Sequence, residues 1–138
     1  MRFCEDDTNS WERPENYSVF ELIENYLTKD KKKTSKILNE NNYSNDDCIL
    51  IIRTFINRSK RLAKLIEEYE KTNNLEKVIT SFKPPIFWKE KETVSTQIKS
   101  WTLKEIKNKI YETNNLEKMI KKNTINSVNF VSDFINNY

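Results

Sequence analysis

The side chains of this chain that could take part in chemistry are two adjacent acidic pairs, two cysteines and several basic residues. The acidic pairs, Asp46-Asp47 and Glu67-Glu68, hold the carboxylates that general acid–base catalysis or a metal site would need. Both pairs lie in segments of helical pattern, where adjacent residues do not face each other. We therefore expect a helix start at the first pair and a solvated helix face at the second, and no catalytic role for either.

The amino-acid composition excludes several kinds of functional site. The chain has 138 residues and contains no glycine and no histidine. Without glycine, phosphate-binding loops and dinucleotide-binding turns cannot form, because both need a close approach of the backbone. Without histidine, Ser-His and Cys-His nucleophilic pairs are excluded, and so are histidine-containing metal sites. We expect no enzyme, no cofactor and no metal ion.

The two cysteines and the apolar content predict a cytoplasmic protein. Cys4 and Cys48 lack the spacing of a metal or redox motif. We expect free thiols of an intracellular protein, and a disulfide is the alternative. Charged residues interrupt any signal-peptide core at the start of the chain. No apolar run approaches the ~18 residues that span a membrane, so no membrane contact is expected.

Two groups of basic residues could contact nucleic acid. Lys29 and Lys31–Lys33 cluster in an expected loop. The longest expected helix carries Arg53, Arg58, Lys60, Arg61 and Lys64, of which Arg53, Arg61 and Lys64 are the candidate contacts. Such side chains release counterions when they contact phosphates. A solvated surface is the alternative, because acids follow closely and no aromatic residue interleaves, as a single-strand platform requires. The net charge of +3 favours neither interpretation.

Apolar residues recur at three- and four-residue spacing and predict helices along most of the chain. The first expected helix begins at a Ser18 capping box, the second carries Ile37 and Leu38, and the third and longest runs from about Asp46 to about Thr72. A short fourth helix covers Asn74 to Phe82, and a fifth follows the prolines and ends near Ser100. The sixth opens at a Thr102 capping box, and the last starts near Asn126. No segment alternates as a strand does. We predict an all-α compact bundle of six to seven helices over 17–138, with residues 1–16 as an irregular lead-in from an upstream module.

Pro84 and Pro85 predict a sharp corner between two helices, because a proline pair cannot continue a helix. Large apolar residues follow at once. We expect Phe87 and Trp88 to be buried anchors of the next helix, and Trp101 to anchor its far end. These five residues form the structural motif of the chain.

A hexapeptide, Thr72–Lys77, recurs unchanged as Thr113–Lys118. A helical repeat would explain the match, but two copies are too few for a solenoid. Biased composition is the simpler explanation, because Asn and Lys are abundant throughout. We also expect Asn to end helices here, where glycine usually does so, because Asn tolerates positive φ.

The proline corner and the residues after it resemble a known family. Phe82–Lys89, then Gln97 and Trp101–Leu103, resemble the C-terminal domain of the bacterial DNA polymerase III delta subunit, part of the sliding-clamp loader. Further similar segments are Phe20–Ile23, Leu50–Leu62 and Leu103–Lys122, and the similarity covers about residues 17 to 137. The family has glycines in its loops, where this chain has Asn.

The resemblance implies a structural role in DNA replication. In clamp loaders, the C-terminal helical domains form a closed collar that holds the ATPase modules around primed DNA. The implied partners are the gamma/tau and delta prime subunits, with DNA contact indirect or weak and no small-molecule substrate. The chain would then be a non-catalytic part of a DNA-directed DNA polymerase holoenzyme. The family's two N-terminal modules have no counterpart here, so a C-terminal fragment is expected. A small basic nucleic-acid-binding module remains the alternative function.

Overall fold

The computed structural model describes residues 14–136, and in this range helices joined by short connections make up the structure, with no strand. The elements are α1 Pro14–Leu27, α2 Lys31–Glu40, α3 Asn45–Thr72, α4 Leu75–Ser81, η1 Trp88–Glu90, α5 Lys91–Ser100, α6 Leu103–Lys122, η2 Thr124–Asn126 and α7 Ser127–Asn136. The prediction of a compact all-α bundle of six to seven helices is confirmed for the described range. None of these helices has both the length and the apolar character needed to cross a membrane.

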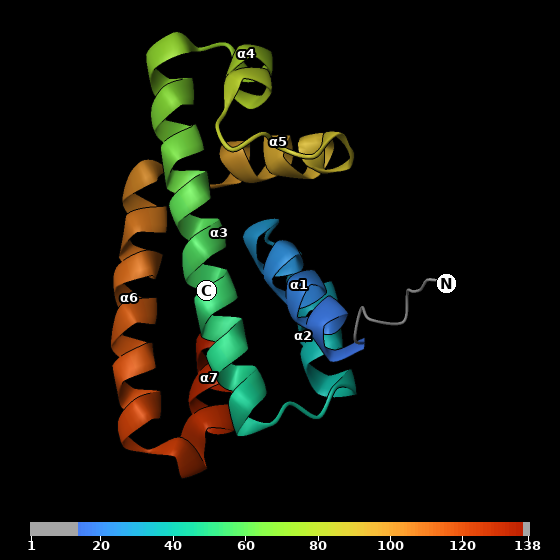
Figure 1. Ribbon diagram of the computed structural model, residues 1–138, viewed down its shortest axis with the longest axis vertical. Coiled ribbons are helices and arrows are strands. Elements are labelled where there is room, and N and C mark those ends of the chain that lie inside the picture. Colours follow the sequence, from blue (N-terminus) through green and yellow to red (C-terminus); the bar gives the residue numbers. More distant parts are fainter. Residues whose placement is uncertain (1–13, 137–138) are drawn as a thin grey trace.

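The long helix α3 is the centre of the bundle (Figure 1). It contacts α1, α4, α5, α6 and α7, and the contact with α6 is the most extensive. Helix α6 runs antiparallel along one side of α3, α1 and α2 lie on the other side, and α4 and α5 lie near its C-terminal end. The buried residues of α3 explain this position, because they spread over more than one side of the helix: Ile51, Ile52, Phe55, Ile56, Leu62, Leu65 and Ile66.

An aromatic cluster joins four parts of the chain in the core. The Tyr26 ring of α1 meets the Phe55 ring of α3 edge-on at 5.1 Å between centroids. Phe134 of α7 stacks on Tyr26 at 5.9 Å and meets Phe55 edge-on at 5.3 Å. Trp101, between α5 and α6, stacks on Tyr26 at 6.2 Å. These contacts are long-range in sequence, so they set the helix arrangement and not the individual helices.

Local signals define most helix ends as expected. The Thr102 capping box is present, since Glu105 N–H donates to the Thr102 hydroxyl and Thr102 N–H donates to the Glu105 carboxylate. Helix α3 likewise opens with Ser44 and Asp47 in a reciprocal capping box. It ends at Asn73, which takes the left-handed conformation with φ of 53°. This confirms the expected role of Asn in place of glycine.

The predicted start of the first helix is wrong. Helix α1 begins at Pro14, so Ser18 lies inside it and is buried rather than serving as its N-cap. Proline suits the first helical position because its fixed φ is helical and its missing N–H would have no partner there. Residues 14–16, predicted as irregular lead-in, are therefore helical. Residues 1–13, which include the rest of that lead-in and Cys4, lie outside the described range.

The repeated hexapeptide adopts two different structures. In Thr72–Lys77 the chain leaves α3, turns at Asn73 and enters α4 at Leu75. In Thr113–Lys118 the same six residues lie inside α6. Tertiary packing decides between the two, because α6 can continue along α3 at the second copy. The hexapeptide is therefore not a structural repeat unit.

The proline corner is present, but the predicted burial of its aromatic residues is wrong. Phe87 is 53% exposed and Trp88 is 68% exposed, whereas Ile86 is buried. Of the three apolar residues after the prolines, Ile86 alone belongs to the core cluster. The prediction for Trp101 is confirmed, since this side chain is buried in the core cluster.

Candidate functional site

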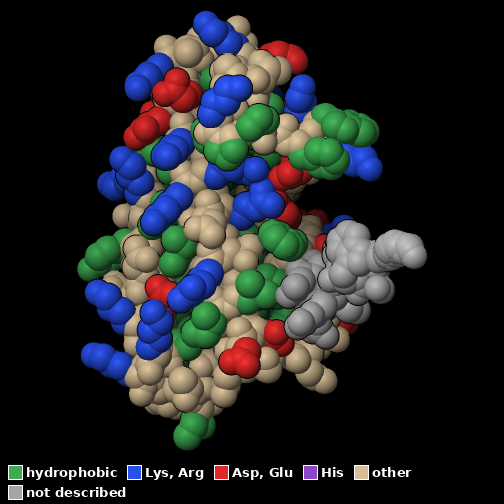
Figure 2. Space-filling model, in the orientation of Figure 1, with side chains coloured by type: hydrophobic (Ala, Val, Ile, Leu, Met, Phe, Trp, Pro, Cys, Tyr) green, Lys and Arg blue, Asp and Glu red, His purple; other side chains and the backbone are tan. Residues whose placement is uncertain are grey.

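Phe87 and Trp88 form an exposed aromatic pair at the corner between α4 and α5. Their ring centroids are 5.9 Å apart and the rings are tilted by 54°. The ammonium of Lys89 lies 5.4 Å from the Trp88 ring and 6.0 Å from the Phe87 ring. We call Phe87, Trp88 and Lys89 the corner patch. In Figure 2, hydrophobic side chains stand out from the surface near the end of the molecule where α4 and α5 lie.

A hollow of about 540 Å³ adjoins the corner patch. Its lining consists of Ile79, Thr80, Pro85, Ile86, Phe87, Trp88 and Lys91. Most of these side chains are apolar, with one hydroxyl and one ammonium. The hollow and the patch together therefore offer a partner both an apolar recess and an aromatic projection.

Glu90 fixes the corner patch to α3. Arg58 Nη1 donates to Glu90 Oε1 at 3.0 Å, and Arg61 Nη2 donates to the same oxygen at 3.3 Å. Arg58 also lies 3.8 Å from Glu24 of α1. All four side chains are partly buried, which shields these pairs from water. The turn η1, and with it the corner patch, is thus held to the bundle.

Sequence reasoning did not identify Glu90. Its only signal is indirect: Arg58 and Arg61 stand one helical turn apart on α3 and need a distant acid when partly buried. Many acids of this chain could have filled that role, so the sequence did not single out Glu90.

Gln97 and Trp101 attach α5 to the C-terminal end of α1. The Trp101 indole N–H donates to the Leu27 carbonyl oxygen at 2.7 Å. Gln97 Nε2 donates to Glu24 Oε2 at 2.8 Å. Gln97 and Trp101 belong to the segment that carries the family resemblance, and both are buried. They therefore position the corner and do not present a surface.

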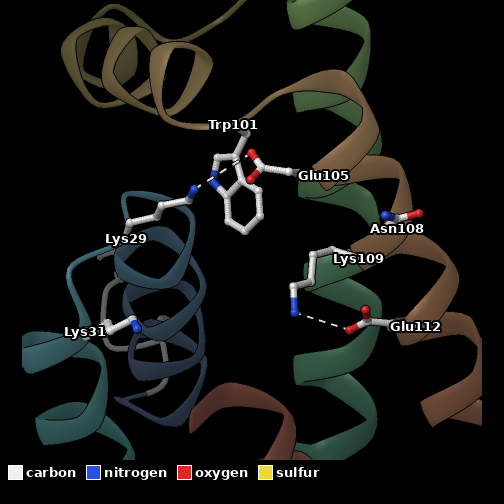
Figure 3. A pocket seen from close by; sticks show the side chains of 7 residues that line it. All are labelled: Lys29, Lys31, Trp101, Glu105, Asn108, Lys109 and Glu112. Carbon is white, nitrogen blue, oxygen red and sulfur yellow. Dashed lines mark hydrogen bonds and ion pairs between the residues drawn. The ribbon is translucent and has the colours of Figure 1, made fainter. Parts of the chain in front are cut away.

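A second hollow, of about 420 Å³, lies over Trp101 (Figure 3). The turn between α1 and α2 lines one wall and α6 lines the other, with the residues Lys29, Lys31, Trp101, Glu105, Asn108, Lys109 and Glu112. The ammonium of Lys29 lies 4.3 Å from the Trp101 ring and 4.0 Å from Glu105. Lys109 donates to Glu112 at 3.2 Å.

The charges in this second hollow serve the fold. Thr102 N–H donates to the Glu105 carboxylate at 2.9 Å, and this bond, helped by the Lys29 charge, lowers the pKa of Glu105. Glu105 is thus held as a helix cap and is not poised to take up a proton. In the pairs Lys29–Glu105 and Lys109–Glu112 the opposite charges balance each other, so we assign no catalytic step to this hollow.

The basic residues suggested for nucleic-acid contact do not lie together. Lys31–Lys33, expected in a loop, form the first turn of α2. Arg53 is exposed and lies 3.8 Å from Glu117 of α6, and Lys64 is exposed on the same side of α3. Arg61 is partly buried against Glu90. The structure therefore separates Arg53 and Lys64, which are accessible, from Arg61, which holds the corner.

The described acidic and cysteine side chains form no cluster of metal-binding type. Within residues 14–136 no group of three or more Cys, Asp and Glu side chains could hold a metal ion. Cys48 is a free, buried thiol, as expected, and burial raises its pKa to about 11. Cys4 lies outside the described part of the chain, so its state stays a prediction.

Comparison of the chain with protein-family models, curated proteins and solved structures found no match.

Proposed function

We propose that this chain is the collar-type assembly domain of a clamp-loader delta subunit, and that the corner patch is its contact with a neighbouring subunit. The observation that carries the proposal is the exposed aromatic pair Phe87 and Trp88, two adjacent rings next to a residue that is hydrogen-bonded to α3. Both residues belong to the segment whose sequence resembles that family.

The chemistry of the corner patch favours a protein partner. Aromatic side chains are enriched at the centres of protein interfaces, where Trp often contributes most of the binding energy. A pair of large rings that stays in water loses the stabilisation that burial would supply. Glu90 and Ile86 hold the patch in place, so little conformational entropy is lost when a partner binds.

The helix arrangement agrees with an assembly role. Each segment that resembles the family forms a helix or the joint between two helices, and Gln97 and Trp101 tie that joint to α1. The proposed role is therefore non-catalytic. In the cytoplasm the domain joins the gamma/tau and delta prime subunits, and the resulting loader places the sliding clamp during DNA replication.

The proposal is tested by reconstitution with purified gamma/tau and delta prime subunits of the same organism. We expect the chain to co-elute with them in size-exclusion chromatography. The double change Phe87→Ala and Trp88→Ala should weaken this binding about 30-fold or more, as the loss of an interface hot spot does. The measurement is a titration by surface plasmon resonance.

The matched control is the double change Tyr111→Ala and Ile125→Ala, which removes exposed apolar side chains away from the corner. It should leave the affinity within about 3-fold of the unaltered chain. Failure of the unaltered chain to join the subunits would overturn the assembly role. Equal loss in both double variants would overturn the assignment of the contact to the corner patch.

A further inference from the structure

Six exposed cations gather on one face formed by α3 and α6. From α3 come Arg53, Lys60 and Lys64, at spacings that keep them on one side of the helix. From α6 come Lys107, Lys118 and Lys121, which also share one side. We call these six residues the α3–α6 face. Figure 2 shows blue side chains concentrated over the two helices.

Ion pairs across the helix boundary show that the two rows belong to one surface. Glu117 of α6 lies 3.8 Å from Arg53 of α3 and 3.7 Å from Lys121. Glu67 of α3 lies 3.8 Å from Lys107 of α6. Acids and bases of both helices therefore meet along the same seam.

The α3–α6 face keeps a surplus of positive charge. Among the described residues no ion pair engages Lys60, Lys64 or Lys118, whereas Glu67 and Glu117 are shared with the other three cations. Glu105 and Glu112 of α6 face the hollow at Trp101, on another side of the helix. Exposed ion pairs contribute only about 0–1 kcal/mol to stability, so these cations can exchange their carboxylate partners for phosphate groups.

The chemistry of this face does not suit a protein partner. Protein interfaces have an apolar centre and are depleted in Lys. Here the exposed large apolar side chains near the cations are scattered, with Leu50 at one end of the α3 row and Tyr111 in the α6 row, and the amides of Asn57 and Asn114 lie between the charges. A single aromatic ring also falls short of a stacking platform for single-stranded nucleic acid.

The dimensions of the face suit a duplex. Arg53 and Lys64 are separated by about 16 Å along the axis of α3, at 1.5 Å per residue. Packed helices lie about 8–10 Å apart, which sets the distance between the two rows. Duplex DNA carries one charge per about 1.7 Å of its axis, so a phosphate is available near every cation.

We propose that the α3–α6 face binds the phosphodiester backbone of double-stranded DNA without regard to base sequence. This site is separate from the corner patch and does not depend on the assembly role. Binding is electrostatic: each cation that replaces a counterion on a phosphate adds to the affinity and to its salt dependence.

The test is fluorescence anisotropy of a labelled 20-base-pair duplex, titrated with the full chain between 50 and 200 mM NaCl. With about six phosphate contacts, the affinity should fall about 10³-fold over this range. The double change Lys60→Gln and Lys64→Gln should reduce that fall to about 10²-fold, because the slope of log K against log salt decreases by about 1.8. The control Lys36→Gln and Lys99→Gln removes the same charge from α2 and α5 and should keep the original slope.

A gain-of-binding variant guards against loss through misfolding. Glu117→Gln releases Arg53 and Lys121 from their shared carboxylate and should strengthen duplex binding several-fold at 50 mM NaCl. Absence of salt-dependent binding, weaker binding by Glu117→Gln, or equal slopes for the two lysine pairs would overturn the proposal. Tighter binding of a single strand of the same length would overturn the choice of a duplex.

Discussion

At the scale of single residues, burial decides what the polar and aromatic side chains of this chain do. Trp101 is buried and its indole N–H binds a backbone carbonyl, so it is a structural residue. Trp88 belongs to the same segment of the sequence and is exposed, so it is available to a partner. Cys48 is buried beside Asp47, and burial together with this charge keeps its thiol protonated.

The environment of Cys48 predicts an unreactive thiol. With a pKa of about 11, the thiolate is a minute fraction of this cysteine at pH 8 in the folded protein. In a Cys4→Ser background, we expect Ellman's reagent to modify Cys48 only after denaturant unfolds the chain. The pKa is higher in the folded than in the unfolded state, so stability should decline as pH rises from about 9 through about 11. Rapid labelling of the native protein at pH 8 would contradict this environment.

At the scale of helices, short local motifs set where each helix begins and ends. Ser44 with Asp47 and Thr102 with Glu105 form reciprocal capping boxes. Asn73 ends α3 in the left-handed conformation. These positions could be predicted because a cap depends on residues within one helical turn. The prediction of a cap at Ser18 is wrong because the helix already begins at Pro14. Inside a helix, the same residue pattern does not form a cap.

The two copies of the hexapeptide allow a matched test of this dependence on context. Asn73 has a φ of 53°, a conformation that Asn tolerates better than Ala because its amide can form local hydrogen bonds. Asn73→Ala should therefore destabilise the protein by about 1 kcal/mol. The equivalent change in the second copy, Asn114→Ala, lies on the exposed surface of α6. It should stabilise by about 0.5 kcal/mol, because Ala is the better helix former.

Urea denaturation followed by circular dichroism measures both changes. Asn73→Gly serves as the control, because glycine adopts positive φ without strain, and it should keep the stability of the unaltered protein. Equal effects of the two Asn→Ala changes would contradict the different backbone conformations of the two copies.

At the scale of the whole molecule, α3 and the aromatic cluster connect the helices of the bundle. Phe55 of α3 contacts rings from α1 and α7, and α3 itself touches five other helices. The corner patch lies outside this network, although Glu90 ties it to α3. Stability and the proposed partner binding therefore reside in different aromatic residues.

A pair of Phe→Ala changes separates these roles. Phe55→Ala removes a fully buried ring and should destabilise the protein by about 3–5 kcal/mol. This is a large part of the free energy of unfolding of a typical protein, about 5–15 kcal/mol. Phe87→Ala removes an exposed ring and should change stability by no more than about 0.5 kcal/mol. Thermal unfolding monitored by circular dichroism distinguishes them. A large loss for Phe87→Ala would show that the corner patch is part of the core.

The sequence by itself determined the all-α class, most helix boundaries and the proline corner, because helical periodicity, caps and prolines act over a few neighbouring residues. Only the tertiary structure decided which residues after the corner are buried, since Ile86 reaches the core while Phe87 and Trp88 do not. It also decided that Arg61 serves Glu90 while Arg53 and Lys64 stay accessible. These outcomes depend on contacts between distant segments, which a local pattern does not encode.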